Sequence, residues 1–523
     1  MTITGEAIID GVQERGAAGS FQAWDPSARA YLEPSFHMVT PEQIDRACAS
    51  AGAAFDTFRA TSDEQRAQFL DTVAEQILAI GDALIERAML ETGLPRVRLE
   101  GERGRTVGQL RLFATLLREG SWNDARLDTA LPERTPPRPD LRMRLIGVGP
   151  VAVFAASNFP LAFSVAGGDT ASAFAAGCPV VLKAHSAHPG TSELVGRAVT
   201  RAVAQCGLPA GVFALLTGTG NGIGQRLVAH PAIQAVGFTG SRSGGTALMA
   251  VAAARKQPIP VYAEMSSINP VFILPQALSA RGAEIGKGFA ASLTLGVGQF
   301  CTNPGLVLAI DGPGLDTFVA AASEALSGSQ GAVMLNQGIA DSYRKGVDAL
   351  AGNEAVTTLA RIDHQEGKGG AAFFRTTADE FVKRHELHDE VFGPASVLVV
   401  CRDAAQMREV AEVLEGQLTA TLQIDGGDIG AARALLPALE RKVGRILANG
   451  YPTGVEVSTA MVHGGPFPST ADGRSTSVGT GAIGRFLRPV CYQNLPAELL
   501  PEVLRDGNPL GVWRRLDGAL TKD

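Results

Sequence analysis

The segment GVGQFCTNPG (296–305) holds one cysteine in a setting that would suit a nucleophile. Cys301 is flanked by glycines, which let the backbone approach a ligand closely. A thiolate attacks a carbonyl carbon and later leaves it, so a cysteine held at a cleft can carry covalent catalysis. A cysteine is more often a small buried hydrophobic residue, and the segment alone leaves both interpretations open.

Three other polar side chains come at or just after the ends of short apolar runs that are expected to be strands. Asn158 follows VAVFAAS, Lys183 ends PVVLK, and Glu264 ends IPVYAE. Ligands of open α/β sheets lie beyond the carboxyl ends of the strands. At such a position an amide can stabilise an oxyanion, a lysine can bind a ribose or a phosphate, and a carboxylate can accept a proton. Each also has a structural interpretation, as a turn asparagine, a solvated lysine or a paired carboxylate.

Two glycine-rich segments are candidates for a site that binds the phosphates of a dinucleotide. The segment LLTGTGNGIG (215–224) does not fit the dinucleotide fingerprint, because residue 223 is isoleucine where the third glycine would fall. The segment VGFTGSRSGG is the better candidate. Its Gly240 and Ser241 lie between an apolar run and a predicted helix whose free N–H groups could face a phosphate.

The pattern of apolar residues predicts the elements that would position these side chains. Over 150–275, short β-branched runs alternate with helical segments, which predicts a parallel sheet covered on both faces. Residues 41–119 have apolar positions at three- and four-residue spacing, which predicts two or more amphipathic helices. The second half alternates less regularly and predicts a second α/β domain. Residues 131–142 are rich in proline and arginine and are expected to connect elements.

Composition narrows the class of protein. A chain of 523 residues exceeds the size of one hydrophobic core. Its 46 Lys and Arg against 53 Asp and Glu give a net charge of -7, without a basic block, which argues against nucleic acid as a partner. Six dispersed cysteines without a CxxC pair predict no metal site and a reducing compartment. No signal peptide or apolar run of membrane-spanning length is present, so we expect a cytoplasmic protein without a membrane partner.

Six segments in order resemble the aldehyde dehydrogenase superfamily, and the similarity runs from about residue 20 to 500. The segments are ASNFPLAFS, VLKAHSAHPGTS, VGFTGS, VYAEMSSINP, GQFCTNPG and DEVFGP. Glu264 and Cys301 are 301 − 264 = 37 positions apart, near the family's separation. The family's common Glu-Leu-Gly-Gly-Lys reads Glu-Met-Ser-Ser-Ile here. With the C-terminal segment, this motif is similar to the branch of α-ketoglutarate semialdehyde dehydrogenases and bacterial NADP-linked fatty aldehyde dehydrogenases.

The resemblance implies an α/β aldehyde dehydrogenase fold with three parts. A Rossmann-like cofactor domain would take residues 1–130 and 150–265, and an α/β catalytic domain would take 266–460. Residues 131–149 and 485–505 would form a small β oligomerisation flap. A homodimer or homotetramer is expected, because a flap strand needs a neighbouring sheet edge to pair with.

The resemblance also implies a covalent mechanism. Cys301 would form a thioester with the aldehyde, the Asn158 amide and the Cys301 backbone N–H would hold the oxyanion, and Glu264 would activate the hydrolytic water. A water-activating base favours a free acid over a CoA ester. The intact set of Cys301, Glu264 and Asn158 speaks against the rival interpretation, an inactive binding or structural protein on the same fold.

NADP or NAD is the implied cofactor, with NADP slightly favoured. No acidic residue in the turn from Lys183 to Ser186 repels a 2′-phosphate, which Ser186 could bind. Against a strong preference, Asn221 stands where an NADP-preferring relative might offer arginine. The implied cofactor residues are Lys183, Ser186, Gly240, Ser241, Glu390 and Phe392.

The aldehyde itself is expected to be α-ketoglutarate semialdehyde, with a broad fatty or aromatic specificity as the alternative. A substrate carboxylate needs donors, and Arg105 and Gln109 would share a helix face at i and i+4. A solvated helix face is the competing interpretation for both. The candidate substrate residues are Arg105, Gln109, Phe163, Phe300, His463 and Phe467.

Overall fold

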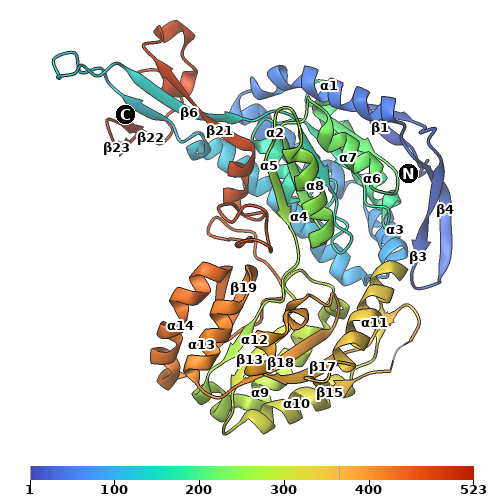
Figure 1. The fold of residues 1–523 in the computed structure, drawn as a ribbon. Coiled ribbons are helices and arrows are strands. Elements are labelled where there is room, and N and C mark those ends of the chain that lie inside the picture. The colour runs from blue at the N-terminus through green and yellow to red at the C-terminus, as the bar shows by residue number, and fades with distance from the viewer. Residues whose placement is uncertain (1, 364, 523) are drawn as a thin grey trace.

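The computed structural model describes residues 2–363 and 365–522, which form two lobes and a projecting arm (Figure 1). A seven-stranded sheet forms the first lobe, in the order β11-β10-β7-β8-β9-β1-β2. Its five strands from β7 to β11 run parallel, whereas β1 and β2 pair antiparallel at one edge. The strands are β1 (Ala7–Ile9), β2 (Val12–Glu14), β7 (Val151–Phe154), β8 (Val180–Lys183), β9 (Phe213–Leu216), β10 (Ala235–Thr239) and β11 (Val261–Glu264).

Helices cover both faces of this sheet, as the alternating pattern predicted. One buried apolar cluster joins the sheet to α2 (Asp63–Leu78), α4 (Arg96–Glu119), α5 (Gly168–Ala175) and α6 (Pro189–Gln205). A second cluster lies across the sheet, under α1 (Pro41–Arg59), α7 (Gly222–Ala229) and α8 (Arg242–Ala253). The helical prediction for 41–119 is confirmed by four helices, since α3 (Asp82–Thr92) lies between α2 and α4.

A second seven-stranded sheet forms the other lobe, in the order β15-β17-β18-β13-β12-β19-β20, and only β15 runs antiparallel to its neighbour. Its strands are β12 (Val271–Ile273), β13 (Leu306–Ile310), β15 (Thr357–Arg361), β17 (Ala372–Thr377), β18 (Ala395–Cys401), β19 (Gln417–Gln423) and β20 (Val443–Ala448). One face packs on α9 (Pro275–Thr294) and α10 (Leu315–Ser327). The other packs on α11 (Gln337–Ala351), α12 (Ala378–Lys383), α13 (Ala404–Val413) and α14 (Ile429–Lys442).

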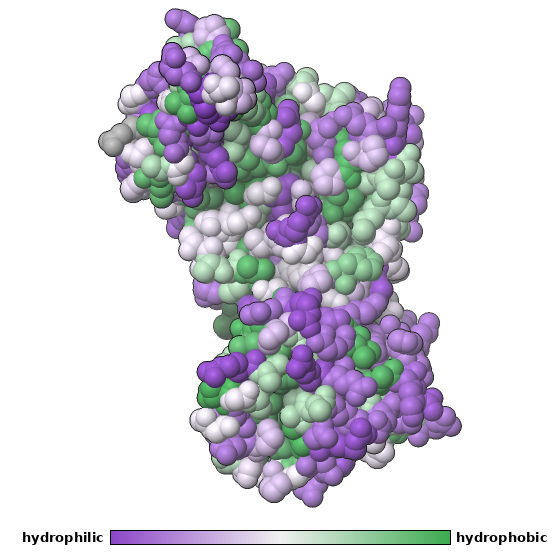
Figure 2. Space-filling view, turned by 60° about the vertical axis from the view of Figure 1, so that its left-hand side comes forward, coloured by the Kyte–Doolittle hydropathy of each residue, from purple (hydrophilic) through white to green (hydrophobic). Residues whose placement is uncertain are grey.

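The arm is a five-stranded sheet in the order β21-β6-β5-β22-β23. Its strands are β5 (Arg126–Asp128), β6 (Leu141–Gly147), β21 (Leu487–Gln493), β22 (Arg514–Leu516) and β23 (Ala519–Thr521). The sheet therefore takes strands from outside the predicted flap ranges as well as from within them. In Figure 2 the arm comes forward at the upper left, with hydrophilic and hydrophobic residues mixed on its surface.

Two short hairpins complete the strands, β3 (Ser20–Asp25) with β4 (Ala30–His37) and β14 (Ala332–Val333) with β16 (Lys368–Gly369). Of the helices in the described residues, none combines the length and the apolar character that crossing a membrane would need.

After β20 the chain returns from the second lobe to the first. Thr470 forms an isolated bridge with Glu264 at the end of β11, and Met265 N–H donates to the Ser469 carbonyl at 2.8 Å. Further on, Ala482 and Phe486 are buried in the core of the first lobe. We call residues 461–486 the return segment. It lies against the carboxyl end of β11, where the sequence predicted a functional carboxylate.

Candidate active site

A left-handed turn presents Cys301. Gly296, Val297 and Gly298 have φ values of 56°, 59° and 62°, a conformation that is costly for a β-branched residue. A Cβ on Gly298 would lie 2.4 Å from the backbone of Gly393, so that position admits only glycine. The glycines around Cys301 thus shape the turn that carries the thiol.

Buried amides fix the backbone on both sides of the thiol. Asn269 Nδ2 donates to the Cys301 carbonyl at 2.8 Å and to the Asn303 carbonyl at 2.9 Å. Asn158 Nδ2 donates to the Gln299 carbonyl at 3.1 Å, two residues before Cys301. An amide carries two N–H donors, so Asn158 keeps a second one for a ligand.

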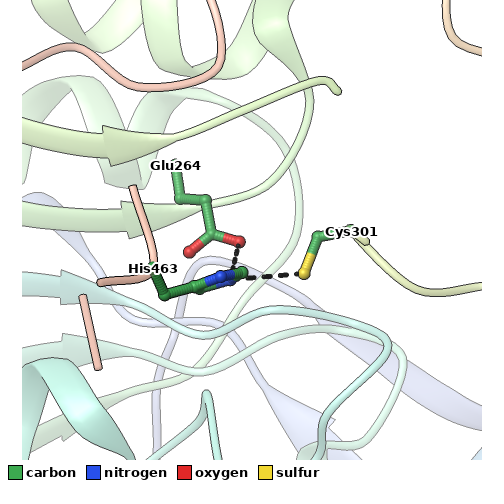
Figure 3. Close-up of side chains that lie close together, drawn as sticks. All are labelled: Glu264, Cys301 and His463. Atoms are coloured by element: carbon green, nitrogen blue, oxygen red, sulfur yellow. Dashed lines mark hydrogen bonds and ion pairs between the residues drawn. The ribbon is translucent and has the colours of Figure 1, made fainter. Parts of the chain in front are cut away.

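Glu264, His463 and Cys301 lie together and point toward one another (Figure 3). The Nε2 atom of His463 is 2.8 Å from Glu264 Oε1 and 3.5 Å from Cys301 Sγ. The Ser477 hydroxyl donates to Glu264 Oε2 at 2.9 Å. Because an ionised carboxylate only accepts hydrogen bonds, His463 carries its hydrogen on Nε2 in this arrangement. That N–H faces both the carboxylate and the sulfur.

The surroundings move the two pKa values of this group in opposite directions. Burial, followed by the charge and hydrogen bond of Glu264 and the charge of Glu390, holds the pKa of the Cys301 thiol well above its usual range. Burial also acts to raise the pKa of Glu264, but His463, Ser477 and Cys301 outweigh it, so that pKa is lowered. At neutral pH, Glu264 is therefore an ionised base beside a protonated thiol.

The same three side chains offer a sulfur, a nitrogen and an oxygen that all lie within 4.8 Å of one another. Such a mixed donor set is of the kind that binds zinc. The sequence held no metal-binding spacing, because these residues come from three distant segments of the chain.

A cleft of about 710 Å³ opens beside the thiol. Of the sequence-predicted site residues, it is lined by Asn158, Ser186, Gly240, Ser241, Glu264, Cys301, Glu390 and Phe392. Ser241 caps α8 by accepting a hydrogen bond from Gly244 N–H at 3.2 Å, so the N-terminus of this helix opens toward the cleft. Lys183 ends β8 three residues before Ser186, and its ammonium forms no ion pair in 2–363 or 365–522.

Glu390 lies on the opposite wall of the cleft from the first lobe. Burial raises its pKa to about 8, although hydrogen bonds from Ser266 and the Ser267 backbone act the other way. Without a ligand in the cleft, this carboxyl is therefore mostly protonated at neutral pH and can donate a hydrogen bond.

The predicted substrate residues divide into two groups. Phe163 lies 6.1 Å from the His463 ring, and the Arg105 guanidinium lies 5.9 Å from the Phe163 ring centroid. Phe300 lies in the turn with Cys301, and its ring is 5.6 Å from that of Phe159. Phe163 and Arg105 thus follow on from His463, and Phe300 adjoins Cys301; none of Phe163, Arg105 and Phe300 lines the described cleft.

Gln109 and Phe467 lie outside that group. Gln109 is 2% exposed, and its amide lies against Gly168 at the start of α5, whereas Arg105, one turn earlier, reaches the carbonyl of Val455. Phe467 is 51% exposed and lies 5.6 Å from the guanidinium of Arg242, at the start of α8. Within 2–363 and 365–522, neither Gln109 nor Phe467 forms a hydrogen bond with Cys301, Glu264 or His463, and neither lines the cleft.

The sequence did not single out Arg98, whose side chain contacts the turn that carries Cys301. Its guanidinium lies 4.4 Å from the Phe300 ring centroid and 4.8 Å from that of Phe159, and its Nη2 donates to the Asn158 carbonyl at 3.1 Å. It also lies 3.9 Å from the buried Glu102 carboxylate. Only the helical pattern of 96–119 pointed to this residue, and the pattern does not say which position faces the site.

Two parallel-sheet lobes that meet over a cleft, with a thiol at its inner end, define the class of two-domain α/β dehydrogenases that act through a cysteine. Comparison with known families gives the membership. The model described as "Aldehyde dehydrogenase family" matches residues 14–479. The chain therefore belongs to the aldehyde dehydrogenase family, whose members are NAD(P)-dependent oxidoreductases that act on aldehydes. The predicted fold class and enzyme class are thereby confirmed.

Two relatives that are similar to nearly the whole chain share one named activity. The chain is 59% identical over 522 residues to alpha-ketoglutaric semialdehyde dehydrogenase 2 of Azospirillum brasilense, covering 99% of both chains. It is 52% identical over 508 residues to alpha-ketoglutaric semialdehyde dehydrogenase of Acinetobacter baylyi, covering 96% of both. Among solved structures, betaine aldehyde dehydrogenase of Staphylococcus aureus in complex with NAD+ has a TM-score of 0.80 at 18% identity, covering 95% of this chain and 97% of that one.

Proposed function

We propose that this protein oxidises α-ketoglutaric semialdehyde to α-ketoglutarate with NAD(P)+, through a thioester on Cys301. The observation that carries the mechanism is the meeting of Cys301, His463 and Glu264 at the inner end of the cleft, with Asn158 on the adjoining wall. The named substrate rests on the two relatives that match the chain almost from end to end.

In the first step, the Cys301 sulfur bonds to the aldehyde carbon while the thiol proton passes to Glu264. The carbonyl electrons move to the oxygen, and the free N–H of Asn158 with the Cys301 backbone N–H receives the resulting charge. His463 Nε2–H faces the sulfur at 3.5 Å and stabilises the thiolate as the proton leaves. The bound dinucleotide supplies a hydride acceptor.

In the second step, water hydrolyses the thioester. Glu264, having released the first proton to solvent, takes a proton from the water as its oxygen bonds to the acyl carbon. The carbon–sulfur bond then breaks, the acid leaves, and the thiolate takes the proton from Glu264, which restores the thiol and the ionised carboxylate. His463 and Ser477 hold one carboxylate oxygen each, which keeps Glu264 aimed at the reacting carbon.

The residues of the cleft, together with Lys183 at the end of β8 three residues before Ser186, fit a dinucleotide. The α8 N-terminus would bind the pyrophosphate, and Lys183 and Ser186 would bind the adenosine ribose. Glu390 would bind the nicotinamide ribose, and Phe392 would pack beside it. Glu264 and Glu390 are the only carboxylates among the residues that line the described cleft, and both lie near enough to Cys301 to act on its pKa. The Ser186 end therefore has no acid to repel a 2′-phosphate, which supports NADP, with NAD as the second cofactor.

We further propose that the first lobe is the cofactor domain, the second lobe the catalytic domain, and the arm an oligomerisation flap. Strand β21 stands at an edge of the arm sheet, with no strand of the described chain on its outer side. An unpaired edge favours pairing with a second copy, which supports a homodimer or homotetramer.

A steady-state comparison tests the activity. Purified protein without CoA should form α-ketoglutarate and NAD(P)H from α-ketoglutaric semialdehyde, with kcat/KM at least about tenfold above that for hexanal. Cys301→Ala should remove the activity, whereas Cys491→Ala on the exposed arm should keep it. Equal efficiency for both aldehydes would favour the second candidate, a broad fatty aldehyde dehydrogenase.

A further inference from the structure

Two arginines from different lobes hold the same loop beside the thiol. Arg105 of α4 donates through Nη1 to the Val455 carbonyl. Arg445 of β20 donates to the Gly454 carbonyl at 3.0 Å and to the Pro452 carbonyl at 2.7 Å. We call residues 452–455 the clamp loop. The two guanidiniums therefore both donate to carbonyls of one short stretch of backbone.

Each of these guanidiniums has a nitrogen left over. Arg105 Nη2 and Arg445 Nε are buried, and neither has a hydrogen-bond partner within 2–363 or 365–522. Neither side chain forms an ion pair with a carboxylate in that part of the chain; carbonyl oxygens are their partners. A buried cationic donor without a partner costs free energy, so two together are expected to await an anion.

The position of both charges relates them to Cys301. Arg445 lies near enough to Cys301 to act to lower the pKa of the thiol, against the stronger effect of burial. Arg105 lies over Phe163, which in turn packs toward His463. Neither arginine is among the residues that line the cofactor cleft, so the anion would lie near the thiol but outside that cleft.

The nearby acids do not fill this role. Glu264 accepts hydrogen bonds from His463 and Ser477. Glu102 accepts through Oε1 from the Leu161 and Ala162 N–H groups, and its carboxylate lies 3.9 Å from Arg98; its Oε2 has no hydrogen-bond partner in the described residues, and it forms no ion pair with Arg105 there. Glu456 adjoins the clamp loop but is exposed and forms no ion pair with either arginine in the described structure. The two unused donors therefore remain for a ligand.

We propose that Arg105 and Arg445 form a carboxylate subsite that holds the far end of a short ω-carboxylate aldehyde while its carbonyl reaches Cys301. This inference rests on the proposed function, whose substrate carries an aldehyde at one end and a carboxylate at the other. Planar guanidiniums suit a carboxylate better than single-point cations do. Specificity would then come from leaving two buried donors empty when the aldehyde is uncharged.

Substitution of each arginine separates this role from simple support of the loop. In Arg105→Ala and Arg445→Ala, kcat/KM for α-ketoglutaric semialdehyde should fall about 10- to 100-fold, while kcat/KM for pentanal stays within about threefold. Arg111→Ala, which removes an exposed charge from the same helix, is the matched control and should change neither. Equal losses for both aldehydes, or no loss for the semialdehyde, would overturn the subsite.

A binding measurement keeps the test independent of the natural substrate. Glutarate should compete with pentanal in the wild-type enzyme, and its inhibition constant should rise about 10- to 100-fold in Arg445→Gln, which preserves side-chain bulk and amide donors. If the wild-type enzyme ignores α-ketoglutaric semialdehyde but glutarate still competes through Arg445, the proposed function fails and the subsite stands. Glutarate inhibition that is absent from the wild type, or unchanged in Arg445→Gln, contradicts the subsite.

Discussion

Glu264 acts on the thiol in two opposing ways. As a base it removes protons, but as a neighbouring negative charge it helps, after burial, to keep the pKa of Cys301 raised. Thiolate therefore accumulates as pH rises through and beyond the neutral range, and alkylation of Cys301 in the cofactor-free enzyme should quicken with pH.

The substitution Glu264→Gln should split these two effects. Removing the charge lowers the pKa of the thiol, so iodoacetamide should label Cys301 faster than in the wild type near pH 7. Hydrolysis of the thioester should meanwhile fall by about 10²-fold or more, since the base is gone. Labelling followed by mass spectrometry of the Cys301 peptide gives the rates, and slower or unchanged labelling would show that Glu264 does not control the thiol pKa.

His463 is the positioning residue for that base. Replacing it with alanine removes the hydrogen bond to Glu264 Oε1, so we expect kcat to fall about tenfold or more through slow hydrolysis. Rapid mixing should then show a burst of NAD(P)H as the thioester accumulates. His463→Gln, which keeps an N–H donor, should recover part of kcat. A variant that is slow but shows no burst would place the role of His463 before hydride transfer.

The closeness of three unlike donors predicts sensitivity to zinc. Zn²⁺ should inhibit by binding the Cys301 thiolate, His463 Nε2 and a Glu264 oxygen, and EDTA should restore activity. Because binding displaces the thiol proton, inhibition should tighten as pH rises. Inhibition curves at about pH 6.5 and about pH 8 measure this. Equal inhibition of His463→Gln and the wild type would place the metal elsewhere.

At the scale of elements, the turn over 296–298 fixes the nucleophile. A methyl group on Gly298 would meet the backbone of Gly393 and Pro394, so Gly298→Ala should destabilise the protein by about 1–3 kcal/mol and reduce turnover. Gly104 in the interior of α4 has open space around its Cα, and Gly104→Ala should stabilise the protein by about 0.5–1 kcal/mol. The midpoint of thermal unfolding should therefore fall in Gly298→Ala and rise in Gly104→Ala. A Gly298→Ala variant with unchanged stability and turnover would contradict the prediction that the turn must be rigid.

The sequence predicted the helices and strands better than it predicted which side chains would face one another. Strand ends located Asn158, Lys183 and Glu264, because a parallel sheet gathers the carboxyl ends of its strands at one edge. His463 was only a weak candidate, since it lies in irregular chain 199 positions from Glu264 and reaches it through the return segment. Gln109 shows the limit of helical spacing: the helix was predicted, but its rotation depends on packing against the first sheet.

At the scale of the whole molecule, the arm carries exposed apolar residues, one in the turn that follows β21 and one on β23, at the opposite edge of its sheet. Leu499 is 67% exposed and Leu520 59% exposed in the single chain. Leu499→Asp should therefore weaken the assembly, seen as a lower mass by light scattering after gel filtration. Val97→Asp, at the end of α4 remote from the arm, is 80% exposed in the wild type and should leave the mass unchanged. A Leu499→Asp oligomer that matches the wild type would exclude this part of the arm from the interface.

The return segment has a consequence for how the protein is made. Cys301 and Glu264 leave the ribosome long before His463, Thr470 and Ser477, yet Glu264 depends on these last residues for both its hydrogen bonds and its backbone bridge. A nascent chain that stops short of residue 463 can complete both central sheets and still lack the histidine that faces the thiol. The catalytic group is therefore completed only by the C-terminal stretch, which is made after every strand of both central sheets.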